Sequence, residues 1–180
     1  GFLFRIEEQA TGRPARLLLQ SRLTPVPTDG IQLLGSREFL PMPVQGQRLA
    51  FVLTANPVKT IVDAEAASKS DKLERLAAKQ LKRPEKSGSL PKSRVPLLKE
   101  EEQRDWLVRR LLEAAELESV EILPHPPFYF RKGSQGGKLV TCTFEGLLHV
   151  KSPQHLVNLL ENGVGPAKAF GCGLLLTRRA

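Results

Sequence analysis

The chain has 180 residues, 41% of them hydrophobic, which provides a core for one large domain or two small ones. It lacks the ~20 consecutive apolar residues of a membrane span, a secretory signal and paired cysteine motifs, since Cys142 and Cys172 stand far apart. These absences argue against a membrane protein or a disulfide-stabilised secreted protein and predict a cytoplasmic one. The net charge of +8 favours a polyanionic partner.

The N-terminal part of the chain predicts a hairpin and then irregular backbone. Residues 2–6 and 15–21 have strand-like composition, and the turn signal Thr11–Pro14 separates them. Prolines and glycines recur between residues 25 and 43, which favours irregular structure. Residues 48–55 then predict a strand that ends at Asn56.

Most of the positive charge lies in residues 69–99. This stretch has ten basic and three acidic residues, so it carries +7 and the rest of the chain +1. Such a concentration predicts contact with nucleic acid, and the alternative is a solvated charged linker. Within the stretch, residues 70–82 predict a short helix that Pro84 stops, and residues 85–91 predict a mobile loop.

Residues 99–116 predict the strongest helix of the chain. Glutamates fill its first turn and arginines its later part, as the helix macrodipole favours. Its expected buried stripe contains Leu107, Leu111, Ala114 and Ala115.

The remaining residues predict strands and a second helix. We expect strands at 120–123, 128–130, 138–150 (with an irregularity at Gly146) and 173–177, and a turn at 133–137. Ser152 and Pro153 predict the start of a helix, Leu156, Leu159 and Leu160 its buried side, and Gly163 its end.

From residue 48 onward, the predicted order is strand, helix, strand, strand, helix, strand, which is the ferredoxin-like or RRM-like topology. The earlier hairpin corresponds to the middle of a second copy. We therefore predict an α+β fold with tandem ferredoxin-like domains. The first, at 1–46, is incomplete at its N-terminus, and the second, at 47–180, has a basic insertion at about 69–94.

Aromatic residues make up only 6% of the chain, and no RNP1 motif is present. We assign Phe128, Tyr129 and Phe130 to the core and a sheet edge. Base stacking on a sheet is therefore not expected. A basic surface without stacking aromatics instead favours recognition of a duplex or a hairpin by its shape and phosphates.

A glycine-rich loop at 163–173 combines four glycines with Lys168. Glycine lets a backbone approach a ligand closely and turn its N–H groups outward, and the lysine adds a positive charge. The glycines follow a helix and precede a strand, so the loop matches neither a dinucleotide fingerprint nor a P-loop. A helix C-cap followed by a turn is the alternative interpretation.

Six segments together resemble the CasE family of CRISPR-associated endoribonucleases, which belong to type I-E Cascade complexes. They are Phe2-Leu3-Phe4, Leu18-Leu19-Gln20-Ser21, Ala55-Asn56-Pro57-Val58-Lys59-Thr60, Arg94-Val95-Pro96-Leu97, Phe144-Glu145-Gly146 and Gly163-Val164-Gly165-Pro166-Ala167-Lys168. The resemblance implies binding of the repeat hairpin of a CRISPR precursor transcript and cleavage at its 3′ base. In that reaction the 2′-hydroxyl attacks the adjacent phosphate, without metal or cofactor. It also implies that the product stays bound within Cascade, beside the backbone subunit at the 3′ end of the guide RNA.

The family's catalytic histidine lies on the first helix of the first domain, which would be upstream of Gly1. His125, His149 and His155 do not match that position and lack metal-ligand spacing, so we assign no catalytic residue and no metal site in this chain. The alternative function is therefore a non-catalytic scaffold that binds the RNA hairpin.

The resemblance and the local chemistry together select candidates for RNA binding. Lys168 is expected to neutralise a phosphate near the cut, and Arg94 to grip phosphates or a guanine edge. The glycines at 163, 165, 171 and 173 would let the loop lie along the RNA backbone. Weaker phosphate candidates are Lys59, Lys92, Lys99 and Lys138. The alternative interpretations are that Lys168 is a solvent-exposed loop lysine, that each glycine is required by a turn, and that Arg94 forms a surface salt bridge.

Overall fold

The computed structural model describes residues 1–7, 12, 14–26, 28–62, 92–132 and 135–180. The chain forms two compact units, one made of Gly1–Pro57 and Leu98–Ala180 and the other of Val58–Leu97. Among the described residues, no helix has the length and apolar character needed to cross a membrane.

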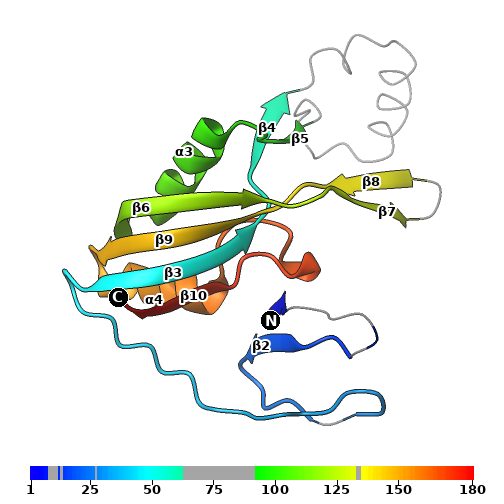
Figure 1. The fold of residues 1–180 in the computed structure, drawn as a ribbon, viewed down its shortest axis with the longest axis horizontal. Coiled ribbons are helices and arrows are strands. Elements are labelled where there is room, and N and C mark those ends of the chain that lie inside the picture. The colour runs from blue at the N-terminus through cyan, green and yellow to red at the C-terminus, as the bar shows by residue number, and fades with distance from the viewer. Residues whose placement is uncertain (8–11, 13, 27, 63–91, 133–134) are drawn as a thin grey trace, which may run out of the picture. The chain divides into compact units, whose positions relative to one another are not determined.

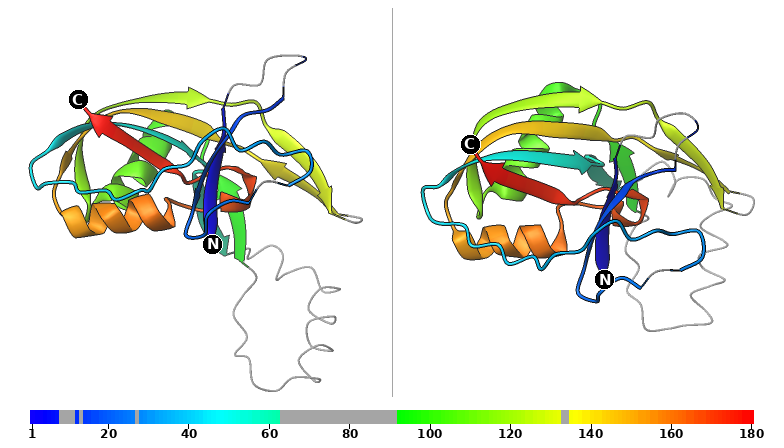
Figure 2. Two further views of the ribbon diagram at one scale, coloured as in Figure 1. Left: turned by 90° about the horizontal axis from the view of Figure 1, so that it is seen from below. Right: turned by 60° about the horizontal axis from the view of Figure 1, so that its bottom comes forward.

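A four-stranded antiparallel sheet forms the centre of the first unit (Figure 1). Its strand order is β10-β3-β9-β6, where β3 spans Arg48–Ala55, β6 Ala115–Pro124, β9 Cys142–Val150 and β10 Leu175–Arg179. Helix α3 (Glu100–Leu111) precedes β6, and α4 (Pro153–Asn162) connects β9 to β10. Both helices lie on the same face of the sheet (Figure 2). This order confirms the predicted ferredoxin-like topology and the α+β class.

The hydrophobic core lies between the sheet and the two helices. Alternate residues of β3 are buried, as expected for a strand with one covered face. Phe51 and Phe144 come from adjacent strands, and Leu107 and Leu156 from the two helices; all four are at most 2% exposed. The ring of Trp106 stacks on Phe144 with 6.1 Å between centroids. The sequence analysis did not include Trp106 in the buried stripe of α3.

Helix α3 ends at Leu111, so the prediction that it continues to residue 116 is wrong. Ala114 lies in the following turn, where its carbonyl accepts hydrogen bonds from the N–H groups of Lys151 (2.9 Å) and Ser152 (3.1 Å). Ala115 already pairs with Val150 as the first residue of β6. Both alanines are buried as predicted, but their hydrogen bonds and pairing with residues 150–152 override their helical propensity.

The predicted long strand at 138–150 is two strands. β8 (Gln135–Leu139) pairs with β7 (Phe128–Lys132) in a separate hairpin, and β9 starts at Cys142. The two residues between these strands have other hydrogen-bond partners. The Val140 carbonyl accepts a 2.6 Å hydrogen bond from the side-chain amide of Asn56, and the Thr141 carbonyl accepts one from the backbone N–H of His125.

The predicted irregularity at Gly146 lies on the neighbouring strand. A β-bulge interrupts β6 between Leu117 and Ser119, and Gly146 pairs with Val120 just beyond it. In addition, β10 begins at Leu175, two residues later than predicted, because Gly173 belongs to the glycine-rich loop.

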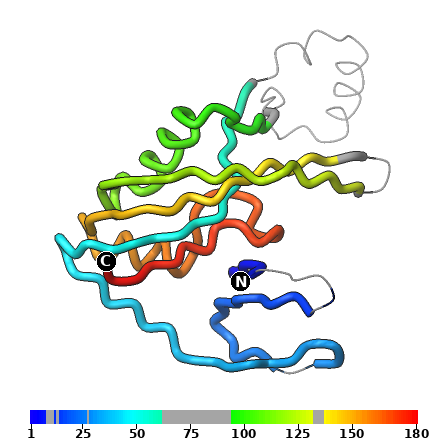
Figure 3. The backbone as a smooth tube through the Cα atoms, viewed as in Figure 1, coloured from blue at the N-terminus to red at the C-terminus, as the bar shows by residue number. Residues whose placement is uncertain are grey.

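The predicted N-terminal hairpin is confirmed. β1 (Phe2–Ile6) pairs antiparallel with β2 (Leu17–Ser21), and the amide of Gln20 donates a 2.8 Å hydrogen bond to the Leu160 carbonyl at the end of α4. The described residues of 22–47 contain no helix or strand, as predicted, and Figure 3 follows them from β2 to β3.

The second unit contains a hairpin that the sequence analysis did not predict. β4 (Val58–Val62) pairs antiparallel with β5 (Lys92–Pro96). The predicted helix at 70–82 and loop at 85–91, with most of the basic stretch, lie outside the described residues.

Candidate nucleic-acid interface

The glycine-rich loop leaves α4 through Gly163, which has φ +75° and donates its N–H to the Leu159 carbonyl. The loop then closes on itself, because the Val164 N–H donates to the Gly173 carbonyl at 2.8 Å. Gly173 in turn donates to the Thr54 carbonyl of β3 at 2.8 Å. The predicted helix end at Gly163 is confirmed, and the loop is attached to the central sheet.

The expectation that the loop glycines turn their N–H groups outward is wrong for three of them. Gly163 and Gly173 donate as described above, and Gly171 donates to the Lys168 carbonyl at 3.2 Å. Two of the four loop glycines allow close packing: a Cβ on Gly163 would lie 2.8 Å from a methyl carbon of Leu3, and one on Gly165 the same distance from the Trp106 ring. Their contact with RNA stays a prediction.

Lys168 is exposed at the start of the short 3-10 helix η1 (Lys168–Phe170). Its ammonium donates a 2.5 Å hydrogen bond to the Asn162 carbonyl at the C-terminal end of α4. A cation is favourable there because it binds a carbonyl without an intrahelical partner and complements the helix dipole. Lys168 is thus a helix-capping lysine whose charge remains accessible to a phosphate.

The β7–β8 hairpin places a second lysine on an aromatic surface. Lys138 is opposite Tyr129 in the ladder, and its Nζ lies 5.7 Å from the centroid of the Tyr129 ring. A shallow cavity of about 560 Å³ is lined here by Tyr129, Phe130, Arg131, Gly137 and Lys138. Tyr129 is 69% exposed and Phe128 57%, so their assignment to the core is wrong, although they do lie at a sheet edge.

Phe130 joins this hairpin to the glycine-rich loop. Its ring covers Gly137, where a Cβ would lie 2.4 Å from a ring carbon, and its centroid is 5.1 Å from that of Phe170 in η1. The structure therefore brings the elements that carry Lys138 and Lys168 into contact, although 30 residues separate the two lysines in the sequence.

The other candidates lie elsewhere. Lys59 pairs with Val95 and Arg94 with Thr60 in the second unit, so the exposed side chains of Lys59 and Arg94 lie on opposite faces of the β4–β5 hairpin. Lys92 pairs with Val62 at the other end of that ladder. Lys99 is exposed in the first unit, immediately before α3, where its carbonyl accepts the N–H of Gln103.

Residues 1–179 match the family model described as CRISPR associated protein. The CRISPR system Cascade subunit CasE of Escherichia coli K12 is 37% identical over 174 residues, which cover 97% of this chain and 79% of that protein. The chain belongs to the CasE family.

A second CasE-family relative is the CRISPR-associated endoribonuclease Cse3 of Thermus thermophilus, 33% identical over 96% of this chain and 77% of that protein. Solved structures agree with both relationships. The crystal structure of Cas6e from E. coli K-12 has a TM-score of 0.78 and 36% identity, covering 99% of this chain and 84% of that one. T. thermophilus Cse3 bound to an RNA representing a pre-cleavage complex has a TM-score of 0.69 and 29% identity, covering 99% and 78%.

Each of the three histidines of this CasE-family chain has a local hydrogen-bond partner. The ring nitrogens of His125 lie 3.1 Å from the hydroxyls of Thr141 and Thr143. Burial, and secondarily the charge of Arg5, lower the pKa of His125. His155 contacts Ser152, the residue that caps α4 as predicted. His149 belongs to the ion-pair cluster described next.

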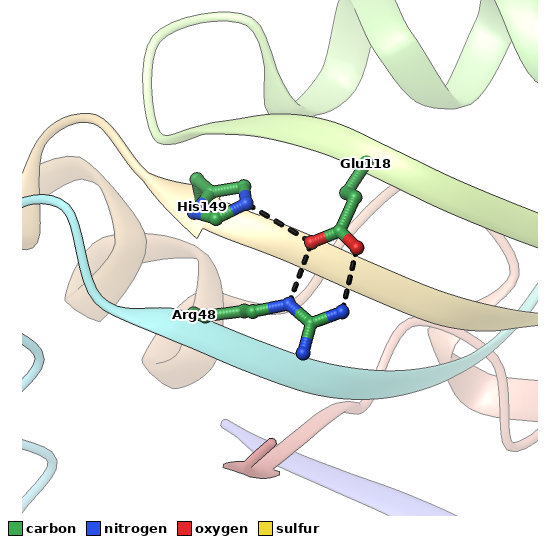
Figure 4. Close-up of polar contacts among 3 residues, drawn as sticks. All are labelled: Arg48, Glu118 and His149. Atoms are coloured by element: carbon green, nitrogen blue, oxygen red, sulfur yellow. Dashed lines mark hydrogen bonds and ion pairs between the residues drawn. The ribbon is translucent and has the colours of Figure 1, made fainter.

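Arg48, Glu118 and His149 form a polar cluster that the sequence analysis missed (Figure 4). Arg48 donates two hydrogen bonds to the Glu118 carboxylate, at 2.7 and 2.6 Å, and His149 Nε2 lies 3.0 Å from the same carboxylate. The hydrogen bond from Arg48 is the main cause that lowers the pKa of Glu118 to about 2. Glu118 is at the bulge, so its position depends on strand register, which no local sequence signal indicated.

We expect the Glu118 ion pair to stabilise the fold only while Glu118 is ionised. Its folded-state pKa of about 2 lies below the ordinary 4.5. The stabilisation is therefore fully present above about pH 4.5 and is lost as the pH falls toward 2. Melting temperatures of the wild type and Glu118→Gln should differ at pH 7 and converge near pH 2, whereas Glu113→Gln, at an exposed glutamate of the turn before β6, should show no such convergence. A difference between wild type and Glu118→Gln that is independent of pH would contradict the assignment.

The cysteines are buried thiols. Burial raises the pKa of Cys142 to about 12 and that of Cys172 to about 11, which keeps both protonated. Both are free, and Cys142 is the first residue of β9. Across the described ranges, His, Cys, Asp and Glu residues form no group of three or more that could hold a metal ion.

Proposed function

We propose that this chain is an RNA-processing subunit that binds the repeat hairpin of a CRISPR precursor transcript and acts in cleavage at the 3′ base of that hairpin. The observation that carries this proposal is the match to the E. coli Cascade subunit over 97% of the chain, together with the relative that is an endoribonuclease. The RNA-bound Cse3 structure supports RNA as the ligand.

The geometry supports an interface around the glycine-rich loop and the β7–β8 hairpin. Lys168 and Lys138 are exposed cations on elements that Phe130 and Phe170 pack together, and Arg131 is exposed beside Lys138. Point charges on a rigid surface suit phosphates whose positions the RNA stem fixes. The four loop glycines serve this interface by allowing the loop to pack closely, and Gly173 lies against the stem of Lys168. We propose Arg94, Lys59 and Lys92 of the second unit, and Lys99 of the first, as separate phosphate contacts outside this interface.

The proposed reaction is an internal transesterification. The 2′-hydroxyl oxygen attacks the adjacent phosphorus and loses its proton, the bond from phosphorus to the 5′-oxygen breaks, and that oxygen takes up a proton. The products are a 2′,3′-cyclic phosphate and a 5′-hydroxyl, with no metal in the step. Lys168 would stabilise charge developing on the phosphate. We assign the proton transfers to none of the described histidines.

The family relationship also supports assembly in a Cascade complex in the cytoplasm. We propose that the chain keeps its product hairpin and contacts the backbone subunit at the 3′ end of the guide. Residues 47–180 would form one ferredoxin-like domain, with the basic insertion at about 69–94, and residues 1–46 would be part of another. The order β3, α3, β6, β9, α4, β10 supports the first of these assignments.

Incubation with a labelled CRISPR repeat hairpin tests the function. We expect tighter binding of the repeat than of an unrelated hairpin with the same stem length, and any cleavage should continue in EDTA and leave a 2′,3′-cyclic phosphate. Equal binding of the two hairpins would contradict CRISPR RNA recognition, and cleavage that requires a divalent metal would contradict the reaction.

The alternative function is a scaffold that binds the RNA hairpin without cutting it. The positions of the three histidines favour it, since none of them matches the position that the resemblance implies for the family's catalytic histidine. Specific binding without any cleavage, in the same incubation, would support the scaffold over the nuclease.

A further inference from the structure

Tyr129 is the most exposed aromatic side chain of the chain, at 69%. It lies on the same face of the β7–β8 hairpin as Arg131, because residues two apart in a strand point to the same side. Lys138 is opposite Tyr129 in the ladder and therefore also on this face. We call these three residues the Tyr129 surface. Phe128 and Phe130 lie on the other face by alternation, and their rings stack there with 6.2 Å between centroids.

The Tyr129 surface combines a flat apolar ring with two cations. The Lys138 ammonium lies 5.7 Å from the centroid of the Tyr129 ring, which is within the range of a cation–π contact. A lysine covers at most one face of a ring, so the other face is available for a second contact. Among the described residues, no carboxylate forms an ion pair with Lys138 or Arg131, and both side chains are exposed. Both charges are therefore available to an anion.

The hairpin that carries this surface is anchored from its other face. The ring of Phe130 covers Gly137 and packs on Phe170 of the glycine-rich loop, with 5.1 Å between the two centroids. The shallow cavity of about 560 Å³ beside Tyr129 has room for a nucleotide. A tyrosine side chain has only two rotatable bonds before its hydroxyl, so it loses little conformational entropy when another ring stacks on it.

An aromatic ring flanked by two cations is complementary to a nucleotide, whose base stacks on the ring and whose phosphates pair with the cations. Within an RNA stem, each paired base is already covered by its neighbours above and below, so the stacked base has to be unpaired. The elements that carry Lys138 and Lys168 contact each other, and Lys168 is the proposed phosphate contact near the cut. The unpaired nucleotide therefore belongs next to the base of the stem.

We propose that Tyr129 stacks on an unpaired nucleotide at the base of the RNA hairpin, and that Arg131 and Lys138 bind the phosphates on either side of it. This inference rests on the proposed function and adds a base contact to an interface that otherwise reads phosphates. It departs from the sequence-based expectation that no base stacks on a sheet. That expectation placed Tyr129 in the core and a sheet edge, whereas its ring is exposed.

Affinity for a repeat hairpin with unpaired nucleotides on both sides of its stem tests the stacking. Tyr129→Ala should weaken binding about tenfold without changing the salt slope, because it removes a stacked base but no charge. Tyr129→Phe keeps the ring and should bind like the wild type. Arg131→Ala should reduce both the affinity and the salt slope, since it removes a phosphate contact.

Phe128→Ala is the matched control, because Phe128 is a similarly exposed ring, at 57%, on the opposite face of the hairpin. We expect this variant to bind RNA as the wild type does. Equal losses of affinity in Phe128→Ala and Tyr129→Ala, or no loss in Tyr129→Ala, would overturn the inference.

Abasic nucleotides identify the stacked base, because they remove the base and keep the phosphates. One abasic replacement among the unpaired nucleotides should weaken binding to the wild type about tenfold and leave binding to Tyr129→Ala unchanged, since both changes remove the same contact. A hairpin shortened to its paired nucleotides should bind the wild type and Tyr129→Ala equally. A loss of affinity in Tyr129→Ala that persists with this shortened hairpin would contradict stacking on an unpaired nucleotide.

Nuclear magnetic resonance observes the contact directly, because Tyr129 is the only tyrosine of the chain and gives one set of ring signals. On saturation with the hairpin, these signals should move upfield, as expected for protons beneath the ring of a base. RNA binding with unmoved tyrosine signals would overturn this inference, leave the proposed function intact and assign the Tyr129 surface to a protein partner. Absence of any RNA binding would overturn both proposals.

Discussion

Gly146→Ala should destabilise the folded chain by about 3 kcal/mol, at the upper end of the range for overpacked sites. A Cβ at this position would lie 2.1 Å from the carbonyl oxygen of Ser119 and 2.9 Å from the Cα of Val120. These are backbone atoms of β6, which cannot rotate away as a flexible side chain can. Relief requires β6 to move away from β9, and that movement would break the pairing beside the bulge.

Urea denaturation of the wild type and Gly146→Ala measures this effect directly. Gly35→Ala is the matched control, because a Cβ there would have no atom within 4 Å and its φ lies outside the left-handed region. That control should be neutral or slightly stabilising, since alanine restricts the unfolded chain. If both variants unfold within about 0.5 kcal/mol of the wild type, the close contact between β6 and β9 is wrong.

Loss of both Lys138 and Lys168 should weaken binding of the repeat hairpin by roughly 100-fold, about tenfold for each charge-assisted contact with phosphate. The two lysines lie on elements that pack together through Phe130 and Phe170, so one RNA stem can contact both. Each lost phosphate contact should also reduce the slope of log affinity against log salt by about 0.7–0.9. Affinity is measured for Lys138→Ala, Lys168→Met and the double variant over a range of salt concentrations.

The lysine that caps α4 needs its own control, because Lys168→Met also removes a hydrogen bond within the protein. Lys151→Met removes a similar bond, to the carbonyl of Leu112 at 3.1 Å, without touching the proposed interface. We expect both variants to lower the melting temperature slightly and only Lys168→Met to lower RNA affinity. Unchanged affinity and salt slope in the double variant would show that the RNA lies elsewhere.

The accuracy of the sequence-based predictions depended on how local each signal was. The strand at 48–55 was predicted correctly because its apolar residues and the terminating Asn56-Pro57 are contained in ten consecutive residues. The start of α4 at Ser152 and its end at Gly163 were predicted correctly for the same reason. The predicted end of α3 was wrong because Ala114 and Ala115, although good helix formers, bind residues that are distant in the sequence. Ala115 pairs with Val150 of β9, and the Ala114 carbonyl accepts hydrogen bonds from the two residues that follow.

The candidate interface shows the same limit. Composition indicated a basic protein, and the glycine-rich run indicated a loop that contains a lysine. Neither indicated which backbone N–H groups of the loop would form hydrogen bonds within the protein. The exposure of Tyr129 was also missed, because an aromatic run in a strand has the same composition whether it is buried or exposed.

The sequence by itself determined the order of most elements, the basic character and the resemblance to CasE, because these depend on neighbouring residues or on matched motifs. The tertiary structure alone decided that Lys168 caps α4, that Phe130 meets Phe170, that Glu118 reaches Arg48 through a bulge and that Trp106 lies under Gly165. Apart from the bond between Lys168 and Asn162, which are six residues apart, each of these contacts joins residues far apart in the chain. Their positions follow from strand register and packing, which local sequence patterns leave undetermined.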